Sequence, residues 1–421
     1  MNMADVLKKI KQKGVKGCAE SLEWHSANTV NKSIFYYWQK KPIDNNLIIM
    51  ESGGEITDNA YALYDYMGKN GYLKKYHVVW LVYEISGPRK DHKIQHLYPN
   101  TEIVWGDPSK VHEKWNKYLA TCKWYIYDHC NMMSSMKKRQ DQILIYLSHG
   151  WGYKAAKGGD INNDKSIYDY MTATGPLSAK GLSEYWRRPL SDTLITGYPR
   201  IDYFYQDDSK VENIVNKKWQ FSTYKKVFFW MPTFRKSIAS ALSEDYISNE
   251  TGLPIFDTEK SLYEFSVFLK NNNILFVLKL HHLQADLPIF KKHLDNILVV
   301  HDEDLTALNI QLYQFIPLSD VLISDYSSIS IDYLALNKPI IFTLDDYDQY
   351  DKSRGLFPKN AKDYMPGYHV YNQKELEDAI AEITDGIDKY KNDRDKVTSE
   401  YHTYRDGNSS KRVLDAIGIK L

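Results

Sequence analysis

Short apolar runs recur along the chain, and segments with a helical pattern separate most of them. A continuous apolar run of this length is typical of a strand buried on both faces of a parallel sheet. The predicted strands are Leu47–Met50, Val78–Val82, Glu102–Trp105, Trp124–Tyr127, Ile143–Leu147, Tyr170–Ala173, Val227–Trp230, Ile274–Leu278, Ile297–Val300, Val321–Ile323 and Ile340–Phe342. The predicted helices include Asn59–Met67, Leu177–Trp186, Leu262–Asn271, Leu308–Phe315 and Glu375–Ile383.

This series of strands is too long for one ordinary open sheet, and the polar segment Gln206–Lys218 interrupts it. We therefore predict an α/β fold with two Rossmann-like domains that face a central cleft. The predicted parts are a basic amphipathic N-terminal segment (1–35), an N-terminal domain (36–210) and a C-terminal domain that ends in a helical tail (211–421). Ligands of open α/β sheets bind beyond the carboxyl ends of the strands, which predicts a site in the cleft.

The segment Ser319–Tyr350 has the pattern of a strand, a tight turn, a helix and a second strand. Its turn places the hydroxyls of Ser327 and Ser328, together with backbone N–H groups, at the start of a helix. Such a helix start binds anions readily, so the turn predicts a phosphorylated ligand. The plainer interpretation is a serine that only caps the helix.

A histidine, His149, follows the predicted strand Ile143–Leu147 and precedes Gly150. A histidine titrates near neutral pH and can therefore take a proton from an attacking hydroxyl. We predict that His149 is a general base, and the alternative is a histidine that merely caps the strand.

Cationic side chains follow two other predicted strands. Lys279 and His281 come after Ile274–Leu278, where alternation sends both to the same side. This pair suits a pyrophosphate, whereas a buried His281 bonded to backbone is the alternative. Arg235 comes after Val227–Trp230 and can grip a phosphate with two N–H groups, unless it is a surface arginine.

Three further side chains are candidates for the same donor site. Thr233 adds a hydroxyl next to the predicted phosphate group. Asp332, one helical turn beyond Ser328, either accepts from ribose hydroxyls or forms a salt bridge. Arg354 either closes over the donor or holds a loop.

Taken together, six blocks in order resemble the CDP-glycerol:poly(glycerophosphate) glycerophosphotransferase family, whose members build teichoic acids and related capsule polymers. The blocks are Glu51-Ser52 with Gly54 and Asp58-Asn59; Ser148-His149-Gly150 with Lys154; Thr196–Arg200 with Asp202; Pro232–Arg235; Lys279-x-His281; and Asp325–Ser328 with Asp332 and Asn337-x-Pro339.

The resemblance implies a glycosyltransferase-B-like architecture and a general-base role for His149. It makes His281 a second catalytic candidate and puts Gly150, Lys154 and Arg200 on the acceptor side. The chain departs from the family where Trp151-Gly152-Tyr153 follows the histidine–glycine pair, since the family often has threonine and proline there.

The predicted activity is a phosphotransferase. It moves glycerol phosphate, or a related alditol phosphate, from a CDP-activated donor to a hydroxyl of a teichoic-acid-like or capsular polymer or its lipid-linked primer, and it releases CMP. The enzymatic alternative is a nucleotide-sugar glycosyltransferase of the same fold. A third hypothesis is a membrane-attached scaffold subunit whose site is vestigial.

Charge and motifs narrow the possible partners. The chain has 54 basic and 54 acidic residues, which argues against a general nucleic-acid binder. A P-loop and a G-x-S-x-G elbow are both absent from the sequence, which counts against an ATPase and an α/β-hydrolase. The acidic clusters His301–Asp304 and Asp345-Asp346 are typical of loop or helix-start charge. We therefore expect no obligatory metal and no cofactor, with CDP-glycerol or another CDP-alditol as co-substrate.

The sequence also predicts a cytoplasmic protein that associates peripherally with the inner face of the cell membrane. No apolar run reaches the roughly 20 residues that span a bilayer, lysines interrupt any signal peptide, and the three cysteines suggest a reducing compartment. Residues 1–17 carry five lysines and one aspartate. They form either an interfacial anchor to anionic lipid or a solvated helix packed on the N-terminal domain.

Overall fold

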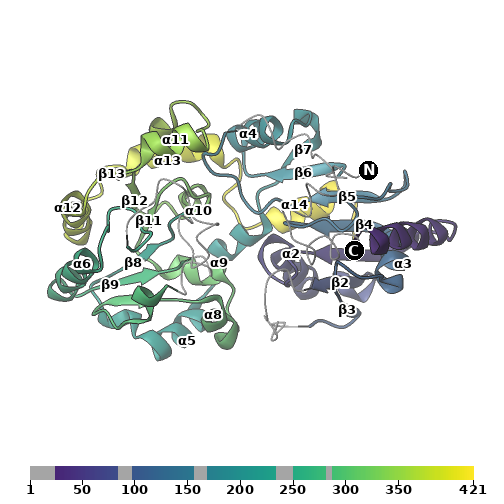
Figure 1. The fold of residues 1–421 in the computed structure, drawn as a ribbon, viewed down its shortest axis with the longest axis horizontal. Coiled ribbons are helices and arrows are strands. Elements are labelled where there is room, and N and C mark those ends of the chain that lie inside the picture. Colours follow the sequence, from purple (N-terminus) through teal and green to yellow (C-terminus); the bar gives the residue numbers. More distant parts are fainter. Residues whose placement is uncertain (1–23, 84–96, 156–167, 234–249, 281–286) are drawn as a thin grey trace, which may run out of the picture. The chain divides into compact units, whose positions relative to one another are not determined.

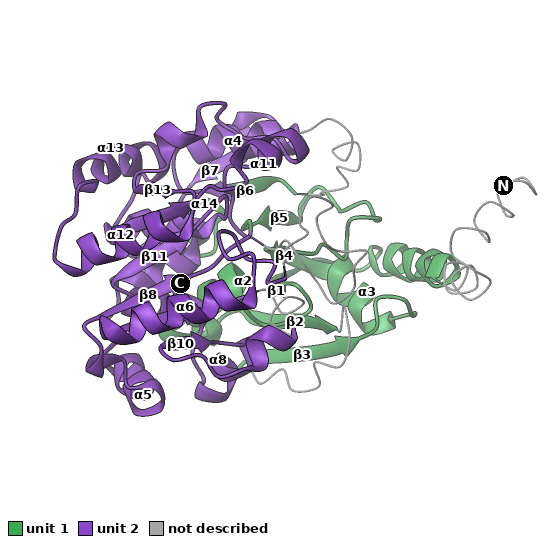
Figure 2. Ribbon diagram, turned by 60° about the vertical axis from the view of Figure 1, so that its left-hand side comes forward, with its two compact units in different colours: residues 1–148, 165–171, 414–421 green, residues 149–164, 172–413 purple. Residues whose placement is uncertain are grey.

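The computed structural model describes residues 24–83, 97–155, 168–233, 250–280 and 287–421. The chain divides into two compact units (Figure 2). Unit 1 comprises residues 1–148, 165–171 and 414–421, and unit 2 comprises residues 149–164 and 172–413. The basic segment 1–17, predicted as an anchor, lies outside the described residues.

The first sheet has seven strands in the order β3-β2-β1-β4-β5-β6-β7. The pairs from β3 through to β6 are all parallel. The strands are β1 (Asp44–Glu51), β2 (His77–Tyr83), β3 (Thr101–Gly106), β4 (Cys122–Tyr127), β5 (Ile143–Tyr146), β6 (Tyr170–Ala173) and β7 (Thr193–Ile195).

The second sheet belongs to unit 2 and has six strands in the order β10-β9-β8-β11-β12-β13. All of its five pairs are parallel. The strands are β8 (Lys226–Trp230), β9 (Ile274–Leu278), β10 (Ile297–Val299), β11 (Val321–Ser324), β12 (Ile340–Thr343) and β13 (Tyr368–Val370).

Both sheets have the Rossmann strand order, in which the direction of strand addition reverses once. The reversal falls between β1 and β4 in the first sheet and between β8 and β11 in the second. The prediction of two Rossmann-like sheets is therefore confirmed. Ligands of such folds bind beyond the carboxyl ends of the strands at these switch points, so the residues that follow β1, β4, β8 and β11 are the first to consider.

In each sheet, helices connect several of the successive strands, such as α2 (Asp58–Lys69) between β1 and β2 and α6 (Glu259–Asn271) between β8 and β9 (Figure 1). Unit 1 contains a helix over residues 24–38, α2 (Asp58–Lys69) and α3 (Glu113–Thr121). The helices that begin in unit 2 are α4 (Pro176–Trp186), α5 (Ser209–Trp219), α6 (Glu259–Asn271), α8 (Asp302–Leu308), α9 (Leu312–Phe315), α10 (Ile329–Tyr333), α11 (Tyr347–Ser353), α12 (Gln373–Thr384), α13 (Lys391–Tyr401) and α14 (Ser409–Ala416). The short 3₁₀ helix η4 (Pro199–Tyr205) also belongs to unit 2.

Apolar positions at helical spacing anchor the core of unit 2. On α6, Leu262, Phe265 and Leu269 are buried and join a cluster with Phe276 of β9. The spacing of three and four residues places these side chains on one face of the helix. Burial of this face against the sheet holds the strand ends, and therefore the residues that follow them, in fixed positions.

Most predicted elements are confirmed within a few residues, but two strands were missed and one predicted helix is wrong. The three-residue strands β7 and β13 were not predicted, because so short a run carries little apolar signal. The predicted helix Leu308–Phe315 is wrong. Helix α8 ends at Leu308, the chain turns at Asn309 with φ of 58°, and α9 begins only at Leu312.

The predicted domain bounds stay a prediction, because the sheets and the compact units divide the chain at different places. The first sheet ends with β7 and the second begins with β8, on either side of residue 210. The compact units instead divide after Ser148, and residues 414–421 belong to unit 1.

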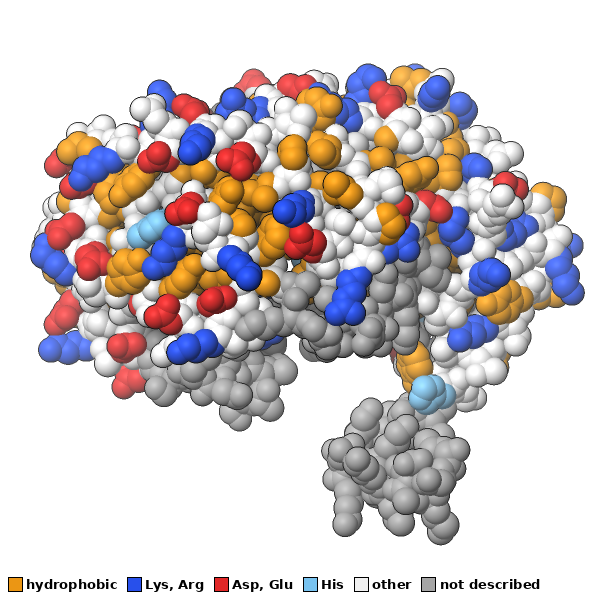
Figure 3. Space-filling model, turned by 90° about the horizontal axis from the view of Figure 1, so that it is seen from above, with side chains coloured by type: hydrophobic (Ala, Val, Ile, Leu, Met, Phe, Trp, Pro, Cys, Tyr) orange, Lys and Arg blue, Asp and Glu red, His pale blue; other side chains and the backbone are white. Residues whose placement is uncertain are grey.

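Two surface properties bear on partners. Figure 3 shows basic and acidic side chains interspersed over the described residues of one face, in line with the balanced charge of the sequence. Among the described residues, no helix is both long and apolar enough to cross a membrane.

Candidate functional site

At the switch point of the second sheet, a buried aspartate joins two strand ends. Asp325 follows β11 directly and is fully buried. Its carboxylate accepts hydrogen bonds from the Thr233 hydroxyl at 2.7 Å, the Thr233 N–H at 2.9 Å and the Ser327 N–H at 3.1 Å. Asp325 therefore ties the loop after β8 to the turn after β11. Asp325 belongs to the turn predicted from the sequence, but no role was predicted for it.

The predicted phosphate-binding turn forms, but some of the hydrogen-bond donors proposed for the phosphate already bind Asp325. Ser328 is the N-cap of the five-residue helix α10, and its side chain makes no cap hydrogen bond. The Ser327 N–H and the Thr233 hydroxyl both donate to Asp325. Contacts of Ser327, Ser328 and Thr233 with a phosphate stay predictions.

The histidine–glycine block lies against this turn within unit 2. Gly150 has a φ of 96°, in the left-handed region. A Cβ at Gly150 would stand 2.5 Å from Nη2 of Arg200 and 2.9 Å from Oγ of Ser328. A Cβ at Gly152 would stand 2.7 Å from the carbonyl oxygen of Tyr326. Both glycines are needed for this close approach, which puts the backbone next to His149 beside Ser328.

The residues after Gly152 pair with a distant segment of unit 2. Lys154 and Leu356 form an antiparallel bridge, and the Phe357 N–H donates to the Tyr153 carbonyl at 2.8 Å. The ring of Trp151 contacts the Phe357 ring edge to face at 5.1 Å. The Trp-Gly-Tyr departure from the family pattern therefore has a packing role here. Lys154 and Arg354 were predicted separately as site residues. In the structure, Lys154 pairs with the segment that follows the exposed Arg354.

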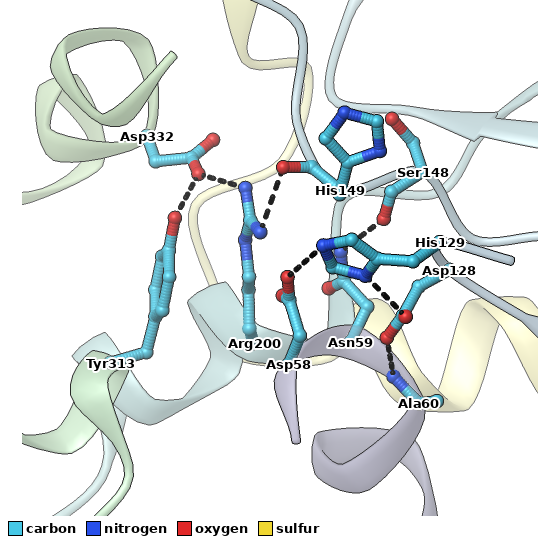
Figure 4. Close-up of polar contacts among 10 residues, drawn as sticks. All are labelled: Asp58, Asn59, Ala60, Asp128, His129, Ser148, His149, Arg200, Tyr313 and Asp332. Carbon is cyan, nitrogen blue, oxygen red and sulfur yellow. Dashed lines mark hydrogen bonds and ion pairs between the residues drawn. The ribbon is translucent and has the colours of Figure 1, made fainter. Parts of the chain in front are cut away.

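A buried ion pair stands beside the same turn. Arg200, 4% exposed, donates from Nη2 to Oδ2 of Asp332 at 2.6 Å and from Nη1 to the His149 carbonyl oxygen at 3.1 Å (Figure 4). The Tyr313 hydroxyl donates to the same Asp332 oxygen at 2.5 Å. The salt bridge, one of the two roles that the sequence left open for Asp332, is thus present. Its contact with ribose, and the acceptor-side role of Arg200, stay predictions.

The rest of the glycine–tyrosine–proline–arginine block holds a helix start. Asp202 accepts from the N–H groups of Ser409 and Ser410, at 2.8 and 2.7 Å, where α14 begins. Burial raises the pKa of Asp202. A Cβ at Gly197 would stand 2.3 Å from Oγ of Ser409, so this glycine permits the close packing. This block therefore has a clear structural function in unit 2.

The predicted cationic group is described only in part. Lys279, 8% exposed, forms an ion pair with Asp302 at 2.8 Å. Asp302 lies with two other acidic residues in the first turn of α8, where negative charge is favourable, as the sequence suggested for this cluster. Arg235 and His281 lie outside the described residues.

At the switch point of the first sheet, a glutamate is buried among tyrosines. Glu51 ends β1 and accepts hydrogen bonds from the hydroxyls of Tyr83, at 2.6 Å, and Tyr125. The Met132 N–H also donates to it, at 3.2 Å. Burial raises the pKa of Glu51 to about 8, against the lowering effect of these hydrogen bonds. Glu51 belonged to a family block in the sequence, but it was not proposed as a site residue.

An aspartate–histidine pair follows β4, and sequence reasoning missed it. Oδ1 of the fully buried Asp128 lies 2.7 Å from Nδ1 of His129. The other oxygen accepts from the Ala60 N–H at 2.8 Å, near the start of α2 (Figure 4). Nε2 of His129 lies 3.9 Å from Oδ2 of Asp58. The signal in the sequence was the polar pair Asp128-His129 directly after a buried strand.

In the described part of the chain, the side chains that could share a metal ion are Asp58, Asp128 and His129, whose ligand atoms lie within 4.8 Å of one another. Both Asp128 oxygens already have hydrogen-bond partners, and burial raises the pKa of Asp128. That the reaction needs no metal stays a prediction.

Comparison with known proteins gives a consistent result. The model of the family described as CDP-glycerol:poly(glycerophosphate) glycerophosphotransferase matches residues 33–418. The teichoic acid glycerol-phosphate transferase of Staphylococcus aureus is 25% identical over 427 residues, which cover 96% of this chain and 99% of that protein. The teichoic acid glycerol-phosphate primase of Bacillus subtilis is 30% identical over 254 residues, or 60% of this chain and 58% of that one.

Solved structures share the fold. The wall teichoic acid polymerase TagF superposes with a TM-score of 0.71 at 18% identity, covering 95% of this chain and 96% of that one.

Proposed function

This chain belongs to the CDP-glycerol:poly(glycerophosphate) glycerophosphotransferase family, and from that premise we propose that His149 is the general base of glycerophosphate transfer. The chain is an enzyme that transfers glycerophosphate from CDP-glycerol in teichoic acid synthesis. Family membership favours this reaction over the nucleotide-sugar transfer and the scaffold role that the sequence left open.

The observation that carries the proposed role is the contact between two turns of unit 2. The backbone at Gly150, next to His149, lies close to Arg200 and Ser328, because a Cβ there would stand 2.5 Å from Nη2 of Arg200 and 2.9 Å from Oγ of Ser328. The candidate base and the candidate phosphate-binding turn are thus close in space, although about 180 residues separate them in the sequence. This arrangement suits an acceptor hydroxyl and a donor phosphate that must meet.

In the proposed reaction, His149 takes the proton of the acceptor hydroxyl. The oxygen forms a bond to the phosphorus that bears glycerol, and the bond from that phosphorus to the oxygen of CMP breaks. CMP leaves with the electron pair. Positioning and electrostatic stabilisation supply most of the rate enhancement of such a displacement. We assign stabilisation of the diphosphate charge to Ser327, Ser328 and Thr233 together with Arg235, Lys279, His281 and Arg354.

The proposed acceptor is a glycerol-phosphate polymer or its lipid-linked primer at the inner face of the cytoplasmic membrane. The helix over residues 24–38 supports membrane contact, because Trp24, Tyr36 and Tyr37 are 44%, 42% and 57% exposed on it. Aromatic side chains of this kind favour the membrane interface, and the basic residues 1–17 precede them in the sequence. Sedimentation of the full chain with anionic vesicles tests this contact.

The test of the reaction is CMP release from CDP-glycerol, with and without a glycerol-phosphate acceptor, by wild type and His149→Ala. We expect acceptor-dependent release by wild type and a loss of about 10²–10⁴-fold in the variant, the range for removal of a general base. Equal rates in the two proteins would overturn the role of His149. Release from CDP-ribitol alone would overturn glycerol as the transferred group.

A further inference from the structure

We propose that Arg200 is a positioning residue for His149, clamping the carbonyl of the histidine so that its turn keeps the geometry needed for proton transfer. This inference rests on the proposed function, since it assigns Arg200 a part in the reaction of His149. It differs from the acceptor-side role that the sequence suggested, because Arg200 acts through the histidine and not on a substrate.

The turn around His149 needs support. Ser148 has a φ of 61° and Gly150 a φ of 96°, so left-handed residues flank His149 on both sides. For Ser148 this conformation is strained, because its Cβ comes too close to the following carbonyl oxygen. Such backbone persists where surrounding contacts hold it. Nη1 of Arg200, 3.1 Å from the His149 carbonyl oxygen, is one such contact.

The guanidinium is itself held rigidly. Asp332, 1% exposed, pairs with Nη2 at 2.6 Å, and the ring of Tyr313 lies 4.5 Å from the Arg200 Cζ. The Tyr313 hydroxyl also donates to Asp332, so the three side chains form one network from η4, α9 and α10 (Figure 4). A planar guanidinium bonds the carboxylate and the carbonyl at once, which a lysine ammonium does not reproduce.

The matched test compares two buried arginines of unit 2. Arg394 is 1% exposed and pairs with Asp388, Nη1 to Oδ1 at 2.8 Å, so it resembles Arg200 without contacting the histidine block. We expect Arg200→Lys and Arg394→Lys both to lower Tm. Only Arg200→Lys should lower kcat for CMP release, about 10–100-fold, because small misplacements of reacting groups have effects of this size. KM for CDP-glycerol should change less than about threefold.

A second set of variants tests the network. Asp332→Asn should lower kcat like Arg200→Lys, and the double variant should fall no further, since the two residues act as one unit. Tyr313→Phe removes one hydrogen bond to Asp332 but keeps the ion pair, so it should lower kcat less than Asp332→Asn does. Additive losses in the double variant, or a kcat of Arg200→Lys equal to that of Arg394→Lys, would overturn the proposal.

A readout independent of turnover separates this inference from the proposed function. In protein with ¹³C-labelled histidine, the imidazole signal lost in His149→Gln identifies His149 among the 13 histidines. That signal should shift in Arg200→Lys and stay in place in Arg394→Lys. An unchanged His149 signal in Arg200→Lys overturns the clamp whether or not wild type turns over. A signal that shifts in Arg200→Lys, together with a wild type that does not turn over CDP-glycerol, would uphold the clamp and refute the proposed reaction.

Discussion

The two Rossmann-like sheets place an aspartate at the same position with different surroundings. Asp128 follows β4 and Asp325 follows β11, each the strand across the switch point from the first strand of its sheet. Both carboxylates are fully buried. Asp325 binds main-chain N–H groups and a hydroxyl of two strand ends, whereas Asp128 binds an imidazole and the start of α2.

The residue after each aspartate makes the difference. His129, which follows Asp128, is exposed, and its Nδ1 is bonded to that carboxylate. Tyr326 follows Asp325, fully buried, with its hydroxyl donating to Asp346 and its ring stacked on Tyr350 at 3.9 Å. Equivalent topology thus produces a titratable pair in unit 1 and an apolar support in unit 2. The position of a strand end in the sheet fixes where a side chain goes, and the residue type decides its chemistry.

Unit 1 therefore has a histidine that resembles part of a catalytic dyad, while the proposed base is His149. The prediction with the largest expected effect distinguishes these two histidines, His129 and His149. His149→Gln should lower kcat about 10²–10⁴-fold. His129→Gln should change kcat less than about fivefold, because we assign the Asp128–His129 pair a structural role: Asp128 also accepts a hydrogen bond from the start of α2. The measurement is CMP release at saturating CDP-glycerol. If His129→Gln proves the more damaging change, the base has been placed on the wrong histidine.

The two aspartates should differ in their contribution to stability. Asp325→Asn weakens three charge-assisted hydrogen bonds and should lower the free energy of unfolding by about 2–3 kcal/mol. Asp128→Asn, which weakens two, should lower it by about 1–2 kcal/mol. Urea unfolding followed by circular dichroism measures both. Asp385→Asn is the control, because the exposed Asp385–Lys225 pair should contribute less than about 1 kcal/mol. Equal losses at Asp325 and Asp385 would refute the bridging role of Asp325.

Glu51 gives unit 1 a pH dependence of its own. Its pKa is about 8 in the folded chain and near 4.5 in an unfolded one. The folded chain therefore keeps a proton that the unfolded chain loses. The stabilisation is complete below about pH 4.5 and is lost as the pH rises to about 8, by at most about 1.4 kcal/mol per pH unit. Thermal unfolding from pH 5 to 8.5 should show this decline in wild type and a flatter curve in Glu51→Gln. Parallel curves would contradict the raised pKa.

The smallest expected effect concerns metal. Removal of divalent ions with EDTA should leave CMP release within about twofold of its original rate, because cationic side chains are assigned to the diphosphate. Asp58→Asn should be equally mild. A large loss in EDTA that Mg²⁺ restores, together with a loss in Asp58→Asn, would instead put a cation at the Asp58–Asp128–His129 group.

Much of this protein follows from its sequence. Buried strands such as Ile274–Leu278 were predicted residue for residue, because parallel strands covered on both faces leave an unbroken apolar run. The turn at Ser327-Ser328 and the strand-end position of His149 followed from the same pattern. Strands β7 and β13 did not, since three residues at a sheet edge give too little periodic signal.

Only the tertiary structure decided which of these residues meet. Hydrogen bonds between Arg200 and the His149 carbonyl, or between Thr233 and Asp325, join positions 51 and 92 residues apart. The sequence shows Glu51 only as one acidic residue of a motif, whereas the fold buries it among tyrosines and thereby raises its pKa. Local sequence sets the backbone pattern through propensity and periodicity. Desolvation and long-range contacts depend on how the strands and helices pack, and they determine whether a polar side chain is a clamp, a cap or a candidate for chemistry.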